Sequence, residues 1–157
     1  ERHEKAASVE PVHLGDVLNT VTRSIKTLIE SAHASISSDF GAGDLVEFNR
    51  DYLQSIFLNF LTNSIKYARP EVYPSIHFST KRIDGHIELT VEDNGLGMDL
   101  KKVGNRIFKL NQSFHGNPDS KGVGLYLVYH HVTALGGKID VESEVNKGTR
   151  FRIIFEK

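Results

Sequence analysis

The sequence predicts an α+β domain in which helices cover one face of a largely antiparallel sheet. Two segments, residues 51–68 and 124–135, carry the residue pattern of helices, while residues 75–92 and 138–155 each hold two alternating runs separated by turn residues. The chain has 157 residues, which suits one domain with a sizeable core.

Composition and charge exclude several functional classes. Hydrophobic residues make up 39% of the chain and the formal net charge is -1, so the strong basic charge of nucleic-acid-binding domains is absent. The lack of cysteine excludes disulfides and cysteine-based zinc sites. No apolar run approaches the ~20 residues that span a bilayer. We therefore expect a piece of a longer cytoplasmic protein, without nucleic-acid or membrane contact of its own.

The N-terminal part of the chain predicts a linker, a helix and two short strands. Residues 1–11 are polar and end at Pro11, which indicates a linker or the tail of a preceding domain. Apolar residues then recur at helical spacing over residues 16–34. Short strands are expected at residues 35–40 and 45–48, with a glycine turn between them.

The strongest helix prediction covers residues 51–68. Its start is marked by Asn49 or Asp51 as N-cap, and Pro70 follows its end. One face of this helix is a continuous apolar stripe. The residues of the stripe are Leu53, Ile56, Phe57, Phe60 and Leu61.

The next segment predicts a β-hairpin. Residues 75–83 and 86–92 both alternate between apolar and polar side chains, with Asp84-Gly85 between them as a two-residue turn signal. The two strands are therefore expected to pair in an antiparallel manner.

The regular pattern breaks down over residues 93–121, which are rich in Gly, Asn, Asp and Lys. A loop of this length inside a compact domain is typically a functional lid or binding loop. A helix over 124–135 follows and ends at Gly136-Gly137. Residues 138–143 and 149–155 then predict a closing pair of strands.

Three polar residues lie beside the apolar stripe of the 51–68 helix. Asn59, Asn63 and Lys66 are spaced i, i+4 and i+7, so they share a face. This face is either simply solvated or a site for a hard cation, because an amide oxygen suits Mg²⁺ and Mg²⁺ commonly accompanies phosphates. Lys66 would then be placed to contact those phosphates.

The motif at the end of the predicted hairpin has two interpretations as well. Asp93, Gly95 and Gly97 follow a strand directly, and Asp-Asn-Gly alone is ordinary turn chemistry. Alternatively, Asp93 accepts a hydrogen bond from an exocyclic amino group such as that of adenine, and the glycines allow a flat ring to approach the backbone.

Two further glycine motifs are weak signals when taken singly. Lys121-Gly122-Val123-Gly124-Leu125 precedes a helix, whose free N–H groups and positive dipole end favour anions. This motif fits neither a Walker A loop nor a G-x-G-x-x-G fingerprint. Gly148, before the last strand, is consistent with a plain hairpin turn.

The order and spacing of the four motifs together are more specific than any one of them. In chain order they are Asn59-x-x-x-Asn63, Asp93-x-Gly95-x-Gly97, Gly122-x-Gly124-Leu125 and Gly148-Thr149. They resemble the N, G1, G2 and G3 boxes of the ATP-binding catalytic domain of bacterial sensor histidine kinases (HATPase_c), in the GHKL superfamily. Phe108 and Phe114 lie where that family has its F box. The resemblance covers nearly the whole chain, from about residue 12 to 155.

The resemblance implies a fold, a domain division and a lid. The fold is a two-layer α/β sandwich of the Bergerat type, with a mixed, mostly antiparallel five-stranded sheet covered by three helices. Residues 12–157 would form the catalytic domain, with an ATP lid at residues 94–121. Residues 1–11 would belong to the linker or to the tail of a dimerisation and phosphoacceptor domain.

The resemblance also implies roles for individual residues. Asn63 would coordinate Mg²⁺. Asn59 would lie by the phosphates or by a metal-bound water, and Lys66 would contact phosphate. Tyr67 would pack by the ribose or base, and Asp93 would accept from the adenine 6-amino group.

The glycine motifs complete the implied site. Gly95 and Gly97 would line the base pocket, and Thr149 would support Asp93 or a bridging water. The residues expected to wrap the phosphates at a helix start are Lys121, Gly122, Val123, Gly124 and Leu125. Further candidates for a γ-phosphate contact are Arg106 and His115.

The implied activity is transfer of the γ-phosphate of Mg·ATP to a histidine. Hydrolysing relatives carry Glu where this chain has Asn59, and Asn cannot act as a general base, which argues against efficient ATP hydrolysis. None of the eight His residues has the context of a phosphoacceptor. The acceptor is therefore expected on a separate dimerisation domain of the parent kinase, with a response regulator downstream.

Two alternatives remain open at this point. The chain could be a non-catalytic nucleotide-binding module that regulates a partner through its lid, or a serine-type kinase of the anti-sigma kind. The intact boxes favour the histidine kinase. The parent protein is either free in the cytoplasm or anchored in the inner membrane.

Overall fold

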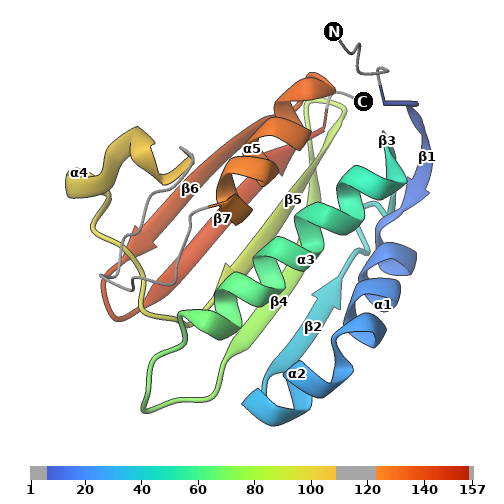
Figure 1. Cartoon of the computed structure of the whole chain (residues 1–157). Coiled ribbons are helices and arrows are strands. Elements are labelled where there is room, and N and C mark those ends of the chain that lie inside the picture. Colours follow the sequence, from blue (N-terminus) through green and yellow to red (C-terminus); the bar gives the residue numbers. More distant parts are fainter. Residues whose placement is uncertain (1–6, 109–122, 156–157) are drawn as a thin grey trace, which may run out of the picture.

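The computed structural model describes residues 7–108 and 123–155 of the chain (Figure 1). In chain order the elements are β1 (Glu10–His13), α1 (Leu14–Ser24), α2 (Lys26–Ala32), β2 (Ser35–Asp39), β3 (Leu45–Phe48), α3 (Arg50–Lys66), β4 (Ser75–Ile83), β5 (His86–Asp93), α4 (Leu100–Val103), the 3₁₀ helix η1 (Gly104–Phe108), α5 (Val123–Ala134), β6 (Lys138–Glu144) and β7 (Gly148–Ile154).

The domain consists of two layers. Five strands form one mixed sheet in the order β2-β4-β5-β7-β6, in which β2 runs parallel to β4 and all other neighbours are antiparallel. Helices α1, α3 and α5 lie side by side on one face of this sheet (Figure 1). The predicted two-layer α/β sandwich with a mixed, mostly antiparallel five-stranded sheet is confirmed.

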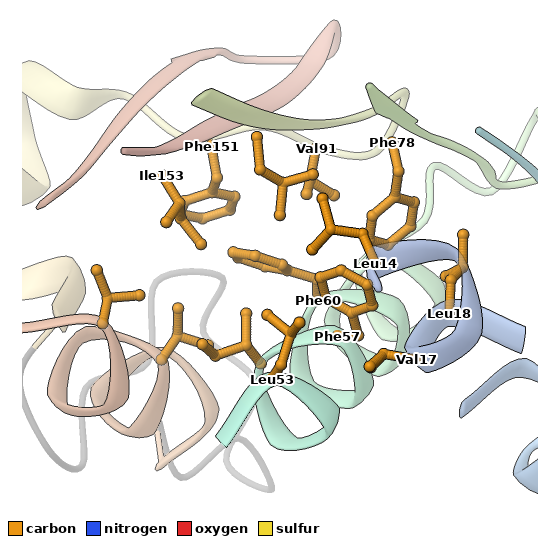
Figure 2. Close-up of a cluster of buried hydrophobic side chains, with 14 of the residues drawn as sticks. Leu14, Val17, Leu18, Leu53, Phe57, Phe60, Phe78, Val91, Phe151 and Ile153 are labelled. Carbon is orange, nitrogen blue, oxygen red and sulfur yellow. The ribbon is translucent and has the colours of Figure 1, made fainter. Parts of the chain in front are cut away.

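Helix α3 is the central helix and packs on the sheet through its predicted apolar stripe. Phe57 lies against Phe78 of β4 with ring centroids 5.0 Å apart, and Phe60 lies against Phe151 of β7 at 4.9 Å (Figure 2). All four rings are buried, and burying such a side chain contributes roughly 1.5–3 kcal/mol. This packing fixes the position of α3 relative to the sheet.

The predicted turn and cap of the central elements are both present. Asp84-Gly85 closes the β4–β5 hairpin, with both residues at positive φ. Of the two candidate caps, Asn49 is the one used: its Oδ1 accepts from the backbone N of Tyr52 at 3.0 Å. The same Asn49 side chain donates from Nδ2 to the carbonyl of Ser8 at 2.9 Å.

The prediction of one continuous helix over residues 16–34 is wrong. The segment forms α1 and α2, with a break at Ile25, whose ψ is 29°. The hydroxyl of Ser24 donates to the carbonyl of Val21 at 2.7 Å, and such local bonds compete with helix hydrogen bonds. Ile25 packs against the core, whereas α2 has no buried residue.

A strand that the sequence pattern does not predict lies at the N-terminal end of the described chain. Strand β1 pairs with β3 in an antiparallel, two-stranded sheet, with Val12 opposite Val46. Both valines are fully buried. Two of the residues interpreted as linker, Glu10 and Pro11, therefore pack on this domain, while the division at residues 11 and 12 stays a prediction.

The predicted lid contains short helices where no regular element was expected. Within residues 94–121, the structure describes only residues 94–108, which include α4 and η1. Asp99 caps α4 by accepting from the backbone N of Lys101 at 3.1 Å.

The face of the sheet opposite the helices carries exposed ion pairs. Arg150 of β7 contacts Glu92 of β5 at 2.7 Å, and Arg152 contacts Glu142 of β6 at 2.9 Å. Hydrogen bonding to Arg152 holds the pKa of the Glu142 carboxyl below its ordinary value. Exposed pairs stabilise little, so the core of the domain is the layer between helices and sheet.

Substitution of the α3 cap tests the importance of Asn49. Asn49→Ala removes the side-chain acceptor for Tyr52 N, and we expect the free energy of unfolding to fall by about 1 kcal/mol. Urea denaturation measures this change. As the control, Asn19→Ala alters an exposed position of α1 and should be neutral or slightly stabilising, since Ala favours helices. Equal stability of the two variants would contradict the assigned cap.

Candidate functional site

A cavity lies between the C-terminal half of α3 and the adjacent ends of β5 and β7, with the start of α5 at one side. Its lining residues are Phe60, Asn63, Ser64, Tyr67, Asp93, Leu96, Gly97, Met98, Leu125, Thr149 and Phe151. Elements that are far apart in the sequence thus contribute to one site. The members singled out from the sequence are Asn63, Tyr67, Asp93, Gly97, Leu125 and Thr149.

The carboxylate of Asp93 is held by three segments of the chain. Its Oδ1 accepts from the backbone N of Gly95 at 2.9 Å and from that of Thr149 at 3.2 Å. Its Oδ2 accepts from the hydroxyl of Ser64 on α3 at 2.7 Å. Because Oδ1 already accepts two bonds, Oδ2 is the oxygen with capacity left for a ligand.

A hydroxyl network lies next to Asp93 at the β7 end of the cavity. Ser143 of β6 donates to the carbonyl of Gly148 at 3.0 Å and contacts the hydroxyl of Thr149 at 2.8 Å. The backbone N of Met98 donates to the same Ser143 oxygen at 2.8 Å. The network ties the loop after β5 to the β6–β7 hairpin.

Gly97 needs the freedom that only glycine has. Its φ is +69°, and a Cβ at this position would collide with the carbonyl oxygen of Glu144. Gly95 is also closely packed, since a Cβ there would lie 2.8 Å from the carbonyl oxygen of Tyr67. Both glycines let the loop after β5 pack closely on its neighbours beside the cavity.

Several polar contacts join the end of α3 to the loop after β5. The backbone N of Leu96 donates to the carbonyl of Tyr67 at 2.9 Å, and Arg69 Nε donates to the carbonyl of Asn94 at 2.9 Å. Asn94 in turn accepts from the backbone N of Ser75 at 2.9 Å. The position of Tyr67 beside the cavity is therefore fixed by backbone contacts.

The two asparagines of α3 differ in their surroundings. Asn63 lines the cavity. Asn59 lies one turn earlier, where its Nδ2 donates to the carbonyl of Ser55 at 2.7 Å. A Cβ on Gly124 would lie 2.8 Å from Asn59 Oδ1, so the start of α5 approaches α3 as closely as it does because residue 124 is glycine.

The remaining predicted residues are only partly accounted for. Lys66 is exposed, with its ammonium 5.6 Å from the centroid of the Tyr67 ring. Arg106 is also exposed and donates to the carbonyl of Lys102 at 3.1 Å, close to α4. Phe108 stacks on Tyr129 of α5 at 5.4 Å.

Other predicted residues fall beyond what the structure describes. Phe114, His115, Lys121 and Gly122 lie outside the described residues. Val123 is the first residue of α5, and only its backbone is described.

The described residues hold neither a cluster of metal-binding side chains nor a helix able to span a membrane. In residues 7–108 and 123–155 there is no group of three or more His, Cys, Asp or Glu side chains that could hold a metal ion. Within the same ranges, no helix is long and apolar enough to cross a membrane.

Sequence reasoning missed two serines of the site. Ser64 follows Phe57, Phe60 and Leu61 at helical spacing, so a polar residue within the buried stripe was the signal that could have revealed it. Ser143 gave no such signal, because it occupies an alternating position of a strand whose neighbours are also polar.

Comparisons with known proteins show the family of the chain. The family model described as histidine kinase-, DNA gyrase B-, and HSP90-like ATPase matches residues 48–157. The histidine-protein kinase ArlS of Staphylococcus haemolyticus is 30% identical over 114 residues, which are 71% of this chain and 25% of that protein. Sensor protein RprX of Bacteroides fragilis is 27% identical over 160 residues, covering 98% of this chain and 30% of that protein. The chain thus spans a quarter to a third of these curated relatives.

Solved structures show the same fold. The catalytic domain of histidine kinase ThkA matches with a TM-score of 0.77 at 18% identity, covering 94% of this chain and 95% of that chain. The mycobacterial sensor histidine kinase MprB matches with a TM-score of 0.77 at 22% identity, covering 93% and 97%. Full-length ShkA in complex with AMPPNP matches with a TM-score of 0.79 at 23% identity, covering 98% of this chain and 32% of that chain.

The domain is a two-layer sandwich whose candidate ligand cavity, partly lined by the Asp93 carboxylate, lies between sheet and helices. The match over residues 48–157 then places it among known proteins. The chain belongs to the family of histidine kinase-, DNA gyrase B-, and HSP90-like ATPases, and it is an ATP-binding catalytic domain of the sensor histidine kinase type.

The requirement for glycine at residue 97 can be tested with a matched pair. Gly85→Ala places a side chain at a φ of +81° with no atom within 4 Å, so only backbone strain of about 1–2 kcal/mol is expected. Gly97→Ala adds a collision with backbone to the same strain. We expect Gly97→Ala to lower the free energy of unfolding more than Gly85→Ala does. We also expect Gly97→Ala to weaken nucleotide binding, whereas Gly85→Ala should leave it unchanged. Denaturation and ADP titration measure both effects, and identical behaviour of the pair would contradict the assigned packing.

Proposed function

We propose that this chain binds Mg·ATP and transfers the γ-phosphate to a histidine on a separate dimerisation domain of its parent protein. The single observation that carries the proposal is the cavity in which Asn63 and Asp93 meet. Asn63 offers an amide oxygen, which suits the Mg²⁺ bound to the phosphates. Asp93 offers a carboxylate oxygen, which suits the amino group of the base. Whole relatives of the chain, such as ArlS, are named histidine-protein kinases.

The adenine end of the nucleotide is assigned to Asp93. Its Oδ2 keeps acceptor capacity beyond the bond from Ser64, which suits the donor N–H groups of a 6-amino purine. Apolar walls from Leu96 and Met98, together with the Tyr67 ring, suit the flat faces of a base. Thr149 supports the carboxylate through its backbone N–H.

The metal end is assigned to Asn63. Mg²⁺ is usually held by one or two protein oxygens together with phosphates and water, so a single amide in the cavity fits the ion. Among the described residues, no group forms a hydrogen bond with the side-chain amide of Asn63. Bound there, Mg²⁺ would neutralise phosphate charge.

The phosphate end is assigned to the region where α5 begins. Backbone N–H groups at a helix N-terminus favour anions, and α5 begins at Val123 beside Asn59. Lys66 is exposed on the same helix as Asn59 and Asn63, and we assign it a contact with the same phosphates. Lys121, Gly122, Val123, Gly124 and Leu125 remain the proposed phosphate-wrapping residues.

The chemistry on the chain's side is positioning rather than proton transfer. Asn59 cannot serve as a general base, and its amide N–H already binds Ser55 within the helix. Holding the nucleotide with its γ-phosphate exposed is what phosphoryl transfer requires of this domain. The acceptor histidine and the response regulator would be supplied by other domains and proteins, in the cytoplasm, where ATP is available.

Exchange of the carboxylate for an amide tests the base assignment. Asp93→Asn can keep the bonds to Gly95 and Thr149 through its oxygen, but it places an N–H donor where Oδ2 lies. We expect ADP affinity to fall about 100-fold, since a charged hydrogen bond is replaced by opposed donors. Calorimetric titration measures the change, and Asp84→Asn, in the distant hairpin turn, is the control that should bind as the wild type does. Unchanged affinity of Asp93→Asn would refute the base assignment.

Removal of the amide tests the metal assignment. Asn63→Ala deletes the only oxygen that the proposal gives to Mg²⁺, so ADP affinity should no longer differ between Mg²⁺ and EDTA. Titration under both conditions gives the comparison. Asn19→Ala, an exposed asparagine on α1, should keep the wild-type dependence on Mg²⁺. If Asn63→Ala keeps it as well, another residue holds the metal.

Transfer itself is tested by incubating the chain with labelled ATP and the parent's dimerisation domain. We expect acid-labile, base-stable phosphate on the dimerisation domain and little label on the chain alone. Acid-stable label would favour a serine-type kinase. Binding of ATP without any transfer would favour a non-catalytic regulatory module.

A further inference from the structure

The buried serine of the cavity, Ser64, donates its hydroxyl proton to the Asp93 carboxylate, which is the group proposed to bind the base. The side chain of Ser64 lies in the cavity lining and the residue is 7% exposed. Two other helical hydroxyls behave differently, because Thr62 of α3 donates to Leu58 O and Thr133 of α5 donates to Tyr129 O, both at 2.8 Å within their own helices. Ser64 instead donates to Asp93 Oδ2 at 2.7 Å.

This bond decides what Ser64 can offer a ligand. A serine hydroxyl has one proton and two lone pairs, and a carboxylate only accepts. With its proton committed to Asp93, Ser64 presents lone pairs alone to anything else in the cavity. Asp93 Oδ2, which lies beside the Ser64 hydroxyl, likewise presents only lone pairs to a ligand.

The hydroxyl proton of Thr149 is also already used in a hydrogen bond. The one proton of the Ser143 hydroxyl goes to the carbonyl of Gly148, so the 2.8 Å contact between Ser143 and Thr149 uses the proton of Thr149. The backbone N of Met98 also donates to Ser143. The three side-chain oxygens of Ser64, Asp93 and Thr149 that line the cavity therefore form an acceptor-only wall.

An acceptor-only wall distinguishes between purines. When the 6-substituent lies at Asp93 Oδ2, as proposed for adenine, a 6-amino purine brings N–H donors to the position where a 6-oxo purine brings an acceptor, and acceptors facing each other without a proton are penalised. A 6-oxo purine also carries a proton on N1, but in this placement that proton does not lie between the 6-oxo group and Asp93 Oδ2. Asp93 alone would not enforce this choice. A water molecule in place of the Ser64 hydroxyl has two protons, so it could donate one to Asp93 and the other to a 6-oxo group.

We propose that Ser64 is a specificity-determining residue, which excludes 6-oxo purines by completing the acceptor-only wall. The inference rests on the proposed nucleotide-binding function and deepens it. It assigns to Ser64 the choice between adenine and hypoxanthine or guanine nucleotides, beyond the strength of adenine binding that Asp93 provides.

The test compares ADP with inosine diphosphate, which carries a 6-oxo group in place of the 6-amino group and a proton on N1. Competition of each nucleotide against a fluorescent ADP analogue, in Mg²⁺, gives the ratio of their affinities for the wild type and for Ser64→Ala. In Ser64→Ala we expect the preference for ADP over inosine diphosphate to fall by a factor of at least about 10. The main cause should be stronger binding of inosine diphosphate. Thr62→Ala removes a hydroxyl from the same helix away from the cavity and should leave both affinities unchanged.

A merely structural role for Ser64 makes a different prediction. If Ser64 only held Asp93 in place, both nucleotides would weaken by the same factor. An equal loss, including loss of both beyond detection, or an unchanged ratio overturns the inference. Failure of the proposed function looks different again, because the wild type would then bind no ADP, or Asp93→Asn would bind it normally.

Discussion

The structure around the site depends on one carboxylate at the junction of sheet and helix. Asp93 ends the central strand β5 and binds Thr149 of β7, Gly95 of the following loop and Ser64 of α3. A carboxylate in such a position must have its oxygens satisfied, since an unpaired buried charge is costly. The same bonds that satisfy Asp93 also leave one oxygen directed to the cavity, so the stability of this junction and the recognition of a ligand use one set of contacts.

Helix α3 links the hydrophobic core to the cavity. Phe60 packs on Phe151 of the sheet and both also line the cavity. Ser64 continues the buried stripe of the helix, Asn63 lies beside it, and both line the same cavity. Because the buried aromatic residues fix the rotation of α3, they also set the positions of Asn63 and Ser64 in the cavity.

How much could be predicted depended on whether the interaction was local in the chain. The β4–β5 hairpin follows from alternation and the Asp84-Gly85 turn, and the start of α3 follows from its cap at Asn49. The break at Ile25 was missed, because the helical spacing of apolar residues continues past Ile25, whereas the residues of α2 that follow it are not buried in the core. Strand β1 was missed as well, since its pairing with β3 joins segments more than thirty residues apart.

The sequence by itself determined the central helices and hairpins, the family and the four motifs, because periodicity, turn chemistry and motif spacing can be read along the chain. Only the tertiary structure decided which groups share a cavity. It brought Asn63 and Asp93 together, kept Asn59 against Ser55 and the start of α5, and gave the proton of Ser64 to Asp93. The physical reason is that a hydrogen bond depends on distance in space and on which partner has a proton to donate, and neither quantity is encoded by any local pattern.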